Sequence, residues 1–159
     1  MHSRIQIVGR GLAIVSGGQT GVDRAALDTA LALGLSCGGW CPRGRRAEDG
    51  PLPARYPLKE TPSRSYPQRT EWNVRDSDAT LVLHRGRRRG GTALTLRLAR
   101  AQGRPALAVD LAAAPSAEEV REWIARERIL RLNVAGPRES EHPGIQAEAA
   151  EFLREVLGA

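Results

Sequence analysis

The chain has 159 residues and a formal net charge of +6 at pH 7, and its aromatic residues are one Phe, two Tyr and three Trp. A chain of this length can bury its own core, so we expect one domain over residues 1–159 with an interior of Leu, Val, Ile and Ala. No apolar run approaches the roughly 20 residues of a membrane span, and the N-terminus lacks the apolar region of a signal peptide. We therefore expect a cytoplasmic protein without a membrane partner.

The basic charge at first suggests a nucleic-acid partner, but the residue types argue against one. Lys59 is the one lysine among the 24 basic residues, and Ala, Gly, Pro and Arg are all abundant, so compositional bias accounts for the arginines. We expect no nucleic-acid partner. A basic surface still favours anionic small ligands through its overall field.

The two cysteines, Cys37 and Cys41, predict neither a disulfide nor a metal site. On a straight strand they would lie about 13 Å apart at roughly 3.3 Å per residue, too far for a disulfide. The histidines (His2, His84 and His142) are scattered, so half a zinc site is less favoured than two buried thiols, and no protein-ligated metal is expected.

The first elements are a buried strand, a glycine turn and a helix. "LAIVS" (residues 12–16) is a continuous apolar run, as in a strand buried on both faces. After "GGQTG" (17–21) comes a helix that ends at Gly34, a glycine in the usual C-cap position. One stripe of this helix is apolar, namely Val22, Ala26, Ala30 and Leu33 with Leu27 and Leu31 beside it.

A second strand is predicted over residues 35–40, followed by a long segment, 42–67, with six prolines. Structureless loops of this length in compact domains are binding loops, lids or disordered segments, and the sequence leaves open whether this one is an ordered wall or a lid. Ser65 and Gln68 then fit a capping box that opens a short helix, "PQRTEWNVRDSD".

The remaining chain continues to alternate. Strands are predicted at 79–84, 105–111 and 129–134, with a helix at 93–103 between the first two. Ser116 and Glu119 form another capping box. Two further helices have buried faces, one with Val120, Trp123 and Ile124 and the last with Ile145, Ala149, Phe152 and Val156. The alternation predicts an α/β fold, a three-layer Rossmann-like domain with a mainly parallel sheet of about five or more strands and helices on both faces.

Ligands of such sheets bind beyond the carboxyl ends of the strands, where the loops converge. Three of the five predicted strand ends here are glycine turns, and four carry arginine close by: "SGGQTG", "CPRGRRAEDG", "HRGRRRGGT" and "NVAGPRES" are the loops concerned. Glycine lets backbone N–H groups approach an anion, and a helix start adds its dipole. Thr20 and Thr92 can add hydroxyl donors at two helix starts. The interpretation is a cleft that binds an anion.

Neither common nucleotide motif is present. The turns lack the lysine of G-x-x-x-x-G-K-[ST] and the spacing of G-x-G-x-x-G, so neither ATP hydrolysis nor dinucleotide binding follows. The alternative for Gly17, Gly18 and Gly21 is that they only permit a tight turn between strand and helix. Convergence of three such turns favours binding.

Arginine side chains are candidate ligands because a guanidinium suits bidentate contact with phosphate-like groups. Arg43, Arg45 and Arg46 follow the second strand, although Glu48 and Asp49 could pair with them instead. Arg87, Arg88 and Arg89 precede Gly90-Gly91-Thr92, and we expect at least one of them to reach the ligand. On the short helix, Arg69, Asn73 and Asp76 recur on one face.

Catalytic residues are not evident. No Ser-His-Asp or Cys-His arrangement stands out, and His84 is a weak candidate at a strand end. The carboxylates near the predicted cleft are Asp23, Glu48, Asp49, Glu71 and Asp110. Asp23 lies in a first helical turn, where the helix dipole alone favours a carboxylate. Asp23 and Glu71 are weak catalytic candidates, and nothing in the sequence requires an enzyme.

Several motifs carry a family resemblance that runs from about residue 11 to 157. With "SGGQTGVDRAALDTALALGL", "PRGRRAEDG", "RTEWNVRDSD", "GGTALT" and "LNVAGPRESEHPGIQAEAAEFL", the chain resembles the molybdenum carrier family. That family is similar to the molybdenum cofactor carrier proteins and to circularly permuted YpsA-type proteins, within the LOG-like, lysine-decarboxylase-like Rossmann group.

The resemblance implies a homo-oligomer, dimer or tetramer, whose subunits bind an anionic pterin-phosphate or nucleotide-like ligand. The carried ligand would be the molybdenum cofactor, whose metal comes with its own dithiolene, and a molybdoenzyme would receive it. The implied binding residues come from four motifs of the chain: they are Gly17, Gly18, Gln19, Thr20, Gly21, Arg43, Arg45, Arg46, Arg69, Asn73, Gly90, Gly91 and Thr92.

The chain departs from the LOG enzymes, which cleave the base from a nucleoside monophosphate. Those enzymes carry a glutamate in a P-G-G-x-G-T-x-x-E pattern, whereas the matching region here reads "GGTALT" without one. A phosphoribohydrolase, with Asp23 as the nearest carboxylate, is therefore the alternative to a carrier. A nucleotide-sensing module that signals through its oligomer is a third reading.

Overall fold

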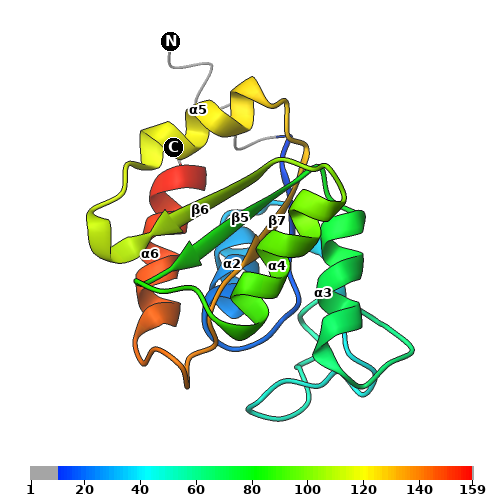
Figure 1. Cartoon of the computed structure of the whole chain (residues 1–159). Coiled ribbons are helices and arrows are strands. Elements are labelled where there is room, and N and C mark those ends of the chain that lie inside the picture. The colour runs from blue at the N-terminus through cyan, green and yellow to red at the C-terminus, as the bar shows by residue number, and fades with distance from the viewer. Residues whose placement is uncertain (1–10, 159) are drawn as a thin grey trace.

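The computed structural model describes residues 11–158, and a parallel sheet of five strands forms their centre (Figure 1). In spatial order the strands are β2 (Cys37–Gly38), β1 (Ala13–Val15), β7 (Arg131–Ala135), β5 (Ala79–His84) and β6 (Ala106–Asp110). Every neighbouring pair in this sheet is parallel. The predicted Rossmann-like α/β fold is confirmed.

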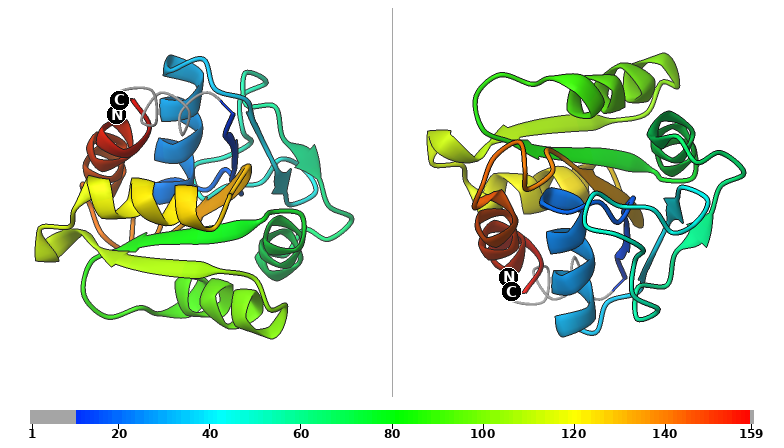
Figure 2. Two further views of the ribbon diagram at one scale, coloured as in Figure 1. Left: turned by 90° about the horizontal axis from the view of Figure 1, so that it is seen from above. Right: turned by 90° about the horizontal axis from the view of Figure 1, so that it is seen from below.

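Helices cover both faces of the sheet (Figure 2). On one face lie α2 (Val22–Ala32), α5 (Ala117–Arg126) and α6 (Ile145–Leu157). On the other lie α3 (Tyr66–Arg75) and α4 (Gly90–Ala101). A short 3₁₀ helix, η1 (Leu111–Ala113), follows β6. The molecule therefore has the three predicted layers.

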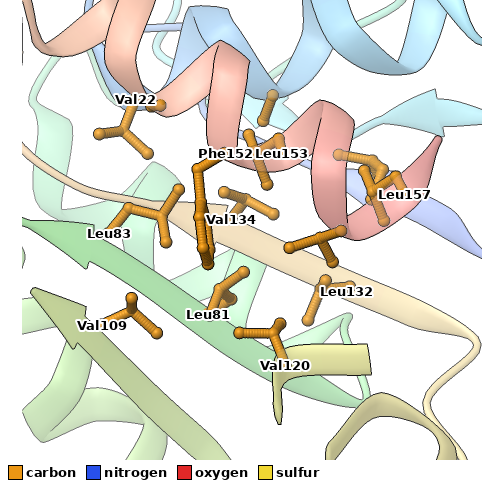
Figure 3. Packing of buried hydrophobic residues seen from close by; sticks show 14 of the residues in the cluster. Val22, Leu81, Leu83, Val109, Val120, Leu132, Val134, Phe152, Leu153 and Leu157 are labelled. Atoms are coloured by element: carbon orange, nitrogen blue, oxygen red, sulfur yellow. The ribbon is translucent and has the colours of Figure 1, made fainter. Parts of the chain in front are cut away.

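The main core lies between the sheet and the face that carries α6. Leu81 and Leu83 of β5 share a buried apolar cluster with Leu132 of β7 and with Phe152 and Leu153 of α6 (Figure 3). Alternate residues of a strand point to opposite faces, so the next side chains along these strands face α3 and α4. The predicted buried faces of α5 and α6 all belong to this core.

The opposite face of the sheet is more polar. Thr80 of β5 and Asn133 of β7 are buried there, and Asn133 Nδ2 donates a hydrogen bond of 3.3 Å to Thr80 Oγ1. Thr92 and Thr95 of α4 are also buried. Buried polar groups normally have hydrogen-bond partners. Their concentration on one face gives the sheet a polar surface there, which could line a site.

The predicted strand over residues 35–40 is wrong in extent. Gly39, with φ +132°, separates β2 from β3 (Trp40–Cys41), and β3 pairs with β4 (Lys59–Glu60) in a second, two-stranded parallel sheet. A Cβ on Gly39 would lie 2.4 Å from Ser16 O. The close approach of these two segments therefore requires glycine, and the strand breaks there.

The segment over residues 42–67 is an ordered wall, one of the two alternatives that the sequence leaves open. It contains β4, and it contributes Leu52, Tyr56 and Leu58 to a second apolar cluster against Leu27 of α2. Tyr56 is almost fully buried, and its hydroxyl donates to Asp28 Oδ1 at 2.6 Å. This second core fixes the segment although β4 is its one strand and most of it is irregular.

Helix ends follow the predictions in part. Gly34, with φ +71°, follows α2 as expected, but Leu31 and Leu33 of the predicted apolar stripe are 42% and 38% exposed. Ser116 Oγ accepts from Glu119 N, as in a capping box. Ser65 makes no such bond, and Gln68 Oε1 accepts from the amide of Ser63.

Both cysteines are free thiols, with Cys41 buried and Cys37 only half-buried. Burial raises the pKa of each. Within residues 11–158 no helix has the length and apolar character needed to cross a membrane.

Candidate functional site

A cavity of about 310 Å³ opens at the carboxyl edge of the sheet, on the side of α3 and α4. Three chain segments that leave strand ends meet there, together with α3. The lining residues are Gly17, Gln19, Asp23, Tyr66, Pro67, Arg69, Thr70, Asn73, Gly91, Thr92, Leu94, Thr95, Asn133, Ala135, Gly136, Arg138 and Glu141. The volume is at the lower end of the range for small-molecule sites.

The topology explains why a crevice forms here. Strand β7 lies between β1 and β5, and the chain leaves β1 and β7 toward α2 and α6 on one face. From β5 it turns to α4 on the other face. Loops that diverge to opposite faces leave a gap beyond the strand ends, the usual ligand position in open α/β sheets.

The backbone amides of the first glycine turn are hydrogen-bonded within the protein. The amides of residues 18–21 all have side-chain acceptors within the protein: Gly18 N donates to Ser16 Oγ (3.2 Å), Gln19 N to Asp23 Oδ2 (3.3 Å), Thr20 N to Gln19 Oε1 (3.1 Å) and Gly21 N to Gln146 Oε1 (2.9 Å). These donors are thus engaged by the protein and are not free to form an anion cradle.

Close packing explains two glycines of this turn. Gly21 has φ +80°, and a Cβ on it would lie 2.3 Å from Pro137 O. A Cβ on Gly17 would lie 2.5 Å from both Cδ and Nη1 of Arg69. The turn therefore positions its neighbours, and Gly17 makes room for the arginine.

The second glycine turn differs from the first. A Cβ on Gly90 or on Gly91 would meet no atom within 4 Å. Gly91 has no positive φ and lines the cavity at the first turn of α4. Neither its backbone conformation nor its protein neighbours require glycine, so space beside a helix N-terminus is left for a ligand.

Arg69 is the cation at the centre of the site. Its side chain is only 9% exposed, and Nη1 donates to Gly17 O at 2.9 Å. The buried Nε has no acceptor among the described residues. Its guanidinium also lies over the ring of Tyr66, 5.0 Å from the centroid. Burial lowers the pKa of Arg69, but an arginine stays charged in proteins, so this group is a positive charge with unused hydrogen-bonding capacity.

Asp23 is the buried carboxylate of the cavity, whereas the lining Glu141 is exposed. Its side chain is 10% exposed, and Oδ2 lies 3.7 Å from Arg69 Nη1 and accepts from the amide of Gln19. Burial raises the pKa of Asp23 from 3.8 to about 6, against the opposing effects of Arg69, of the Gln19 amide and of Arg24. The desolvation cost therefore exceeds the attraction of its neighbours.

Other predicted ligand residues in this region are occupied by structural bonds. The Asn73 amide accepts from Trp40 N at 2.8 Å and donates to Trp40 O at 3.0 Å, so it holds β3 in place at the cavity wall. The Thr20 hydroxyl bonds to Glu48 and accepts from Glu139 N, and Thr20 does not line the cavity. Gln19 does line it, with Oε1 accepting from the amides of Thr20 and Glu48.

The remaining predicted residues lie outside the cavity lining. Arg45 donates to the carbonyl oxygens of residues 52, 53, 56 and 58 and so stabilises the fold of the segment over residues 42–67. Arg46 donates to Arg64 O, and Arg43 is exposed. Glu71 and residues 87–89 are exposed as well.

Neither of the two histidines within residues 11–158 lines the cavity. His84 is buried, and its Nδ1 lies 2.8 Å from Gly86 O in the turn after β5. His142 does not line the cavity, and His2 lies outside the described residues.

The structure adds side chains that sequence reasoning missed. Arg138 and Glu141 come from the loop after β7 and pair at 3.0 Å at the cavity. The "NVAGPRES" loop carried the signal for Arg138, a glycine and an arginine two positions apart just after a strand end. Asn133 and Thr95 also line the cavity. A polar residue inside the buried strand "ILRLNV" was the signal for Asn133.

Chemically, the site can hold an anion. A buried guanidinium, the first turn of α4 and polar side chains converge on one cavity, and a carboxylate that titrates near neutrality lies beside them. Among residues 11–158 no group of three or more His, Cys, Asp or Glu side chains is arranged to hold a metal ion.

Comparison with known proteins places this chain in a family. Residues 14–157 match the model of the family described as "Circularly permutated YpsA SLOG family". A crystal structure titled "Putative molybdenum carrier protein", from Syntrophus aciditrophicus SB, is 42% identical with a TM-score of 0.89, covering 94% of this chain and 97% of that one. No curated protein matches the chain. The resemblance seen in the motifs is confirmed, and the chain belongs to the circularly permutated YpsA SLOG family.

Proposed function

We propose that this protein is a carrier for an anionic small molecule, held in the cavity at the carboxyl edge of the sheet. The observation that carries the proposal is Arg69, a guanidinium more than nine-tenths buried at the cavity with Nε unpaired. Burying a charge is costly unless it is paired. A ligand anion would complete the pairing that Asp23, at 3.7 Å, makes only in part.

The second support is the open space at Gly91. A phosphate oxygen there would meet the first amides of α4 and the side chain of Thr92, where the helix dipole favours negative charge. Arg69 and the helix start both face this cavity, so one phosphate-sized group could contact both. The donors implied here are Arg69, Gly91 and Thr92. The first glycine turn positions Arg69, because Gly17 O accepts from its Nη1.

A molybdenum-containing pterin phosphate, or a similar nucleotide-like molecule, is the proposed cargo. The similar structure from Syntrophus aciditrophicus is titled as a molybdenum carrier, which motivates the metal. The cofactor brings its own dithiolene, so it needs anion donors from the protein and no metal ligands. The donors of the cavity fit that requirement.

The first test is to identify what the protein carries. The protein is purified anaerobically and denatured, and the released small molecules are identified by mass spectrometry beside a molybdenum determination. A pterin with molybdenum near one per subunit supports the carrier. A nucleotide without metal contradicts the molybdenum cargo, and an empty Arg69→Gln variant beside a loaded parent assigns the cargo to this cavity.

Asp23 favours a second candidate, a hydrolase that cleaves the base from a nucleoside monophosphate. A carboxyl group with a pKa of about 6 at a cavity wall can exchange a proton near neutral pH. Release of free base from a nucleoside monophosphate, lost in Asp23→Asn and kept in Glu71→Gln, would establish the enzyme. Binding of the nucleotide without any release would exclude it.

Assembly and delivery complete the proposal. We expect a dimer or tetramer, and a molybdoenzyme as the recipient of the cargo. Light scattering with and without ligand tests the assembly, and a ligand-dependent change in subunit number without turnover would favour a sensor.

A further inference from the structure

We propose that the cavity binds its anion together with one proton. Asp23 takes up this proton from solvent when Arg69 pairs with the ligand instead of with the Asp23 carboxylate. This inference rests on the proposed function, because it requires an anion in the same cavity. It adds a property that neither the fold nor the family implies: affinity that depends on pH through one identified carboxyl group.

The argument begins with the geometry of the pair. Asp23 on α2 and Arg69 on α3 both line the cavity, with Oδ2 and Nη1 3.7 Å apart and each side chain at most 10% exposed. This distance exceeds that of a hydrogen bond. The two groups attract each other through a medium with little water, but Arg69 keeps hydrogen-bonding capacity for another partner.

Arg69 is the one lining cation available to Asp23 among the described residues. Arg24, the next residue in α2, is paired with Asp49: each Arg24 Nη atom lies 3.0 Å from an Asp49 carboxylate oxygen. The Arg24 Nε donates to Gly18 O. Arg138, in the loop after β7, pairs with Glu141 at 3.0 Å. An anion that takes Arg69 therefore leaves the Asp23 carboxylate without another free positive charge.

A bound anion also adds negative charge beside Asp23. Like charges within about 4–6 Å disfavour ionisation of a carboxyl group. Burial already places the pKa of Asp23 at about 6 before any ligand is present. The anion raises it further, so at neutral pH an ionised Asp23 must take up a proton as the anion binds.

Calorimetry measures this proton directly. Inorganic sulfate is the probe, because it remains a dianion throughout the pH range used and contributes no proton of its own. Titration of the full chain at about pH 7, in buffers of different ionisation enthalpy, gives the number of protons taken up per sulfate. We expect a value approaching one, and an affinity that falls by up to about tenfold per pH unit above pH 6.

Two variants assign the proton. In Asp23→Asn, which keeps the shape of the side chain and cannot ionise, we expect sulfate to bind without proton uptake and with little pH dependence. The control is Glu71→Gln, an exposed carboxylate of α3 outside the cavity, which should behave like the parent. Circular dichroism and a thermal melt establish that each variant is folded, and the buffer comparison on the parent chain stands without any variant.

The outcomes separate the two proposals. Sulfate binding without proton uptake overturns this inference and leaves the anion site in place. Uptake that persists in Asp23→Asn assigns the proton to another group and also overturns it. Absence of sulfate binding to the parent at about pH 5.5 and pH 8 contradicts the anion site itself, and the inference falls with it.

Discussion

At the scale of single residues, the proposed anion site depends on one buried guanidinium and one open glycine position. Arg69 and Gly91 are separated by 22 positions in sequence, yet both line the cavity. Of the other arginines within residues 11–158, Arg138 alone lines it. Two substitutions test these two residues.

Replacing Arg69 by Gln should weaken sulfate binding at least tenfold. A hydrogen bond to a charged group contributes about 1.5–3 kcal/mol, and about 1.4 kcal/mol corresponds to tenfold in affinity. Isothermal titration at low salt measures the effect. Arg43→Gln, the same loss of charge on an exposed side chain, is the control and should change affinity little. Equal losses in the two variants would show that only the overall field matters.

Replacing Gly91 by Ala should reduce affinity without reducing stability. The added methyl group meets no protein atom within 4 Å, and alanine favours a helix over glycine by about 0.5–1 kcal/mol. Urea unfolding and sulfate titration measure the two effects. Gly17→Ala should instead lower the free energy of unfolding, because its methyl group would lie 2.5 Å from Arg69. Unchanged affinity in Gly91→Ala would remove this glycine from the site.

At the scale of elements, the wall segment over residues 42–67 shows how an arginine-rich loop can be structural. Arg45 joins its carbonyl groups, and Tyr56 anchors it to α2 through Asp28. The segment then carries β4 beside β3 and borders the helix that holds Arg69. Its order comes from these bonds and from a small apolar cluster.

Arg45→Ala should therefore destabilise the protein by about 1–3 kcal/mol, because four carbonyl oxygens, most of them partly buried, lose their donor. Its effect on sulfate affinity should be small. Urea unfolding and limited proteolysis within the segment measure the loss. Arg43→Ala, which removes an exposed side chain, provides the comparison. A variant that keeps its stability and loses affinity would return Arg45 to the ligand site.

At the scale of the whole molecule, the buried Asp23 makes folding stability depend on pH in the opposite sense to a typical paired carboxylate. The pKa of Asp23 is about 6 in the folded chain and 3.8 as its ordinary value. Between these values the folded state binds more protons than the unfolded state, so the free energy of unfolding decreases as pH rises. Above about pH 6 the folded state carries the full free-energy cost of burying an ionised Asp23.

Asp23→Asn should remove that penalty. The difference between the two pKa values corresponds to about 3 kcal/mol. Between about pH 4 and pH 7 the free energy of unfolding of the parent should therefore fall by up to about 3 kcal/mol more than that of the variant. Urea unfolding at several pH values measures both profiles. If Asp23→Asn loses as much stability as the parent over this range, Asp23 is not held in a desolvated site.

Much of the fold followed from local patterns. The apolar runs at residues 12–16 and 79–84 predict buried strands, and the stripe with Ile145 and Phe152 predicts a packed helix. Strands and helices that alternate in this way have few arrangements that obey right-handed crossovers. The division of residues 35–41 between two sheets was missed because Gly39 acts through its contact with Ser16, which lies far away in sequence.

The sequence by itself determined the α/β fold, the family and the edge of the sheet at which a site should form, because periodicity and motif spacing are local properties. It also placed Gly17, Gln19, Arg69, Asn73, Gly91 and Thr92 among the candidates that line the cavity. Only the tertiary structure decided which donors remain available. The amides of residues 18–21 donate to side chains of the protein, among them Gln146, and Arg45 is used within its loop. Arg69, by contrast, is buried with unpaired hydrogen-bonding capacity. Whether a donor is free depends on acceptors that folding brings from distant parts of the chain.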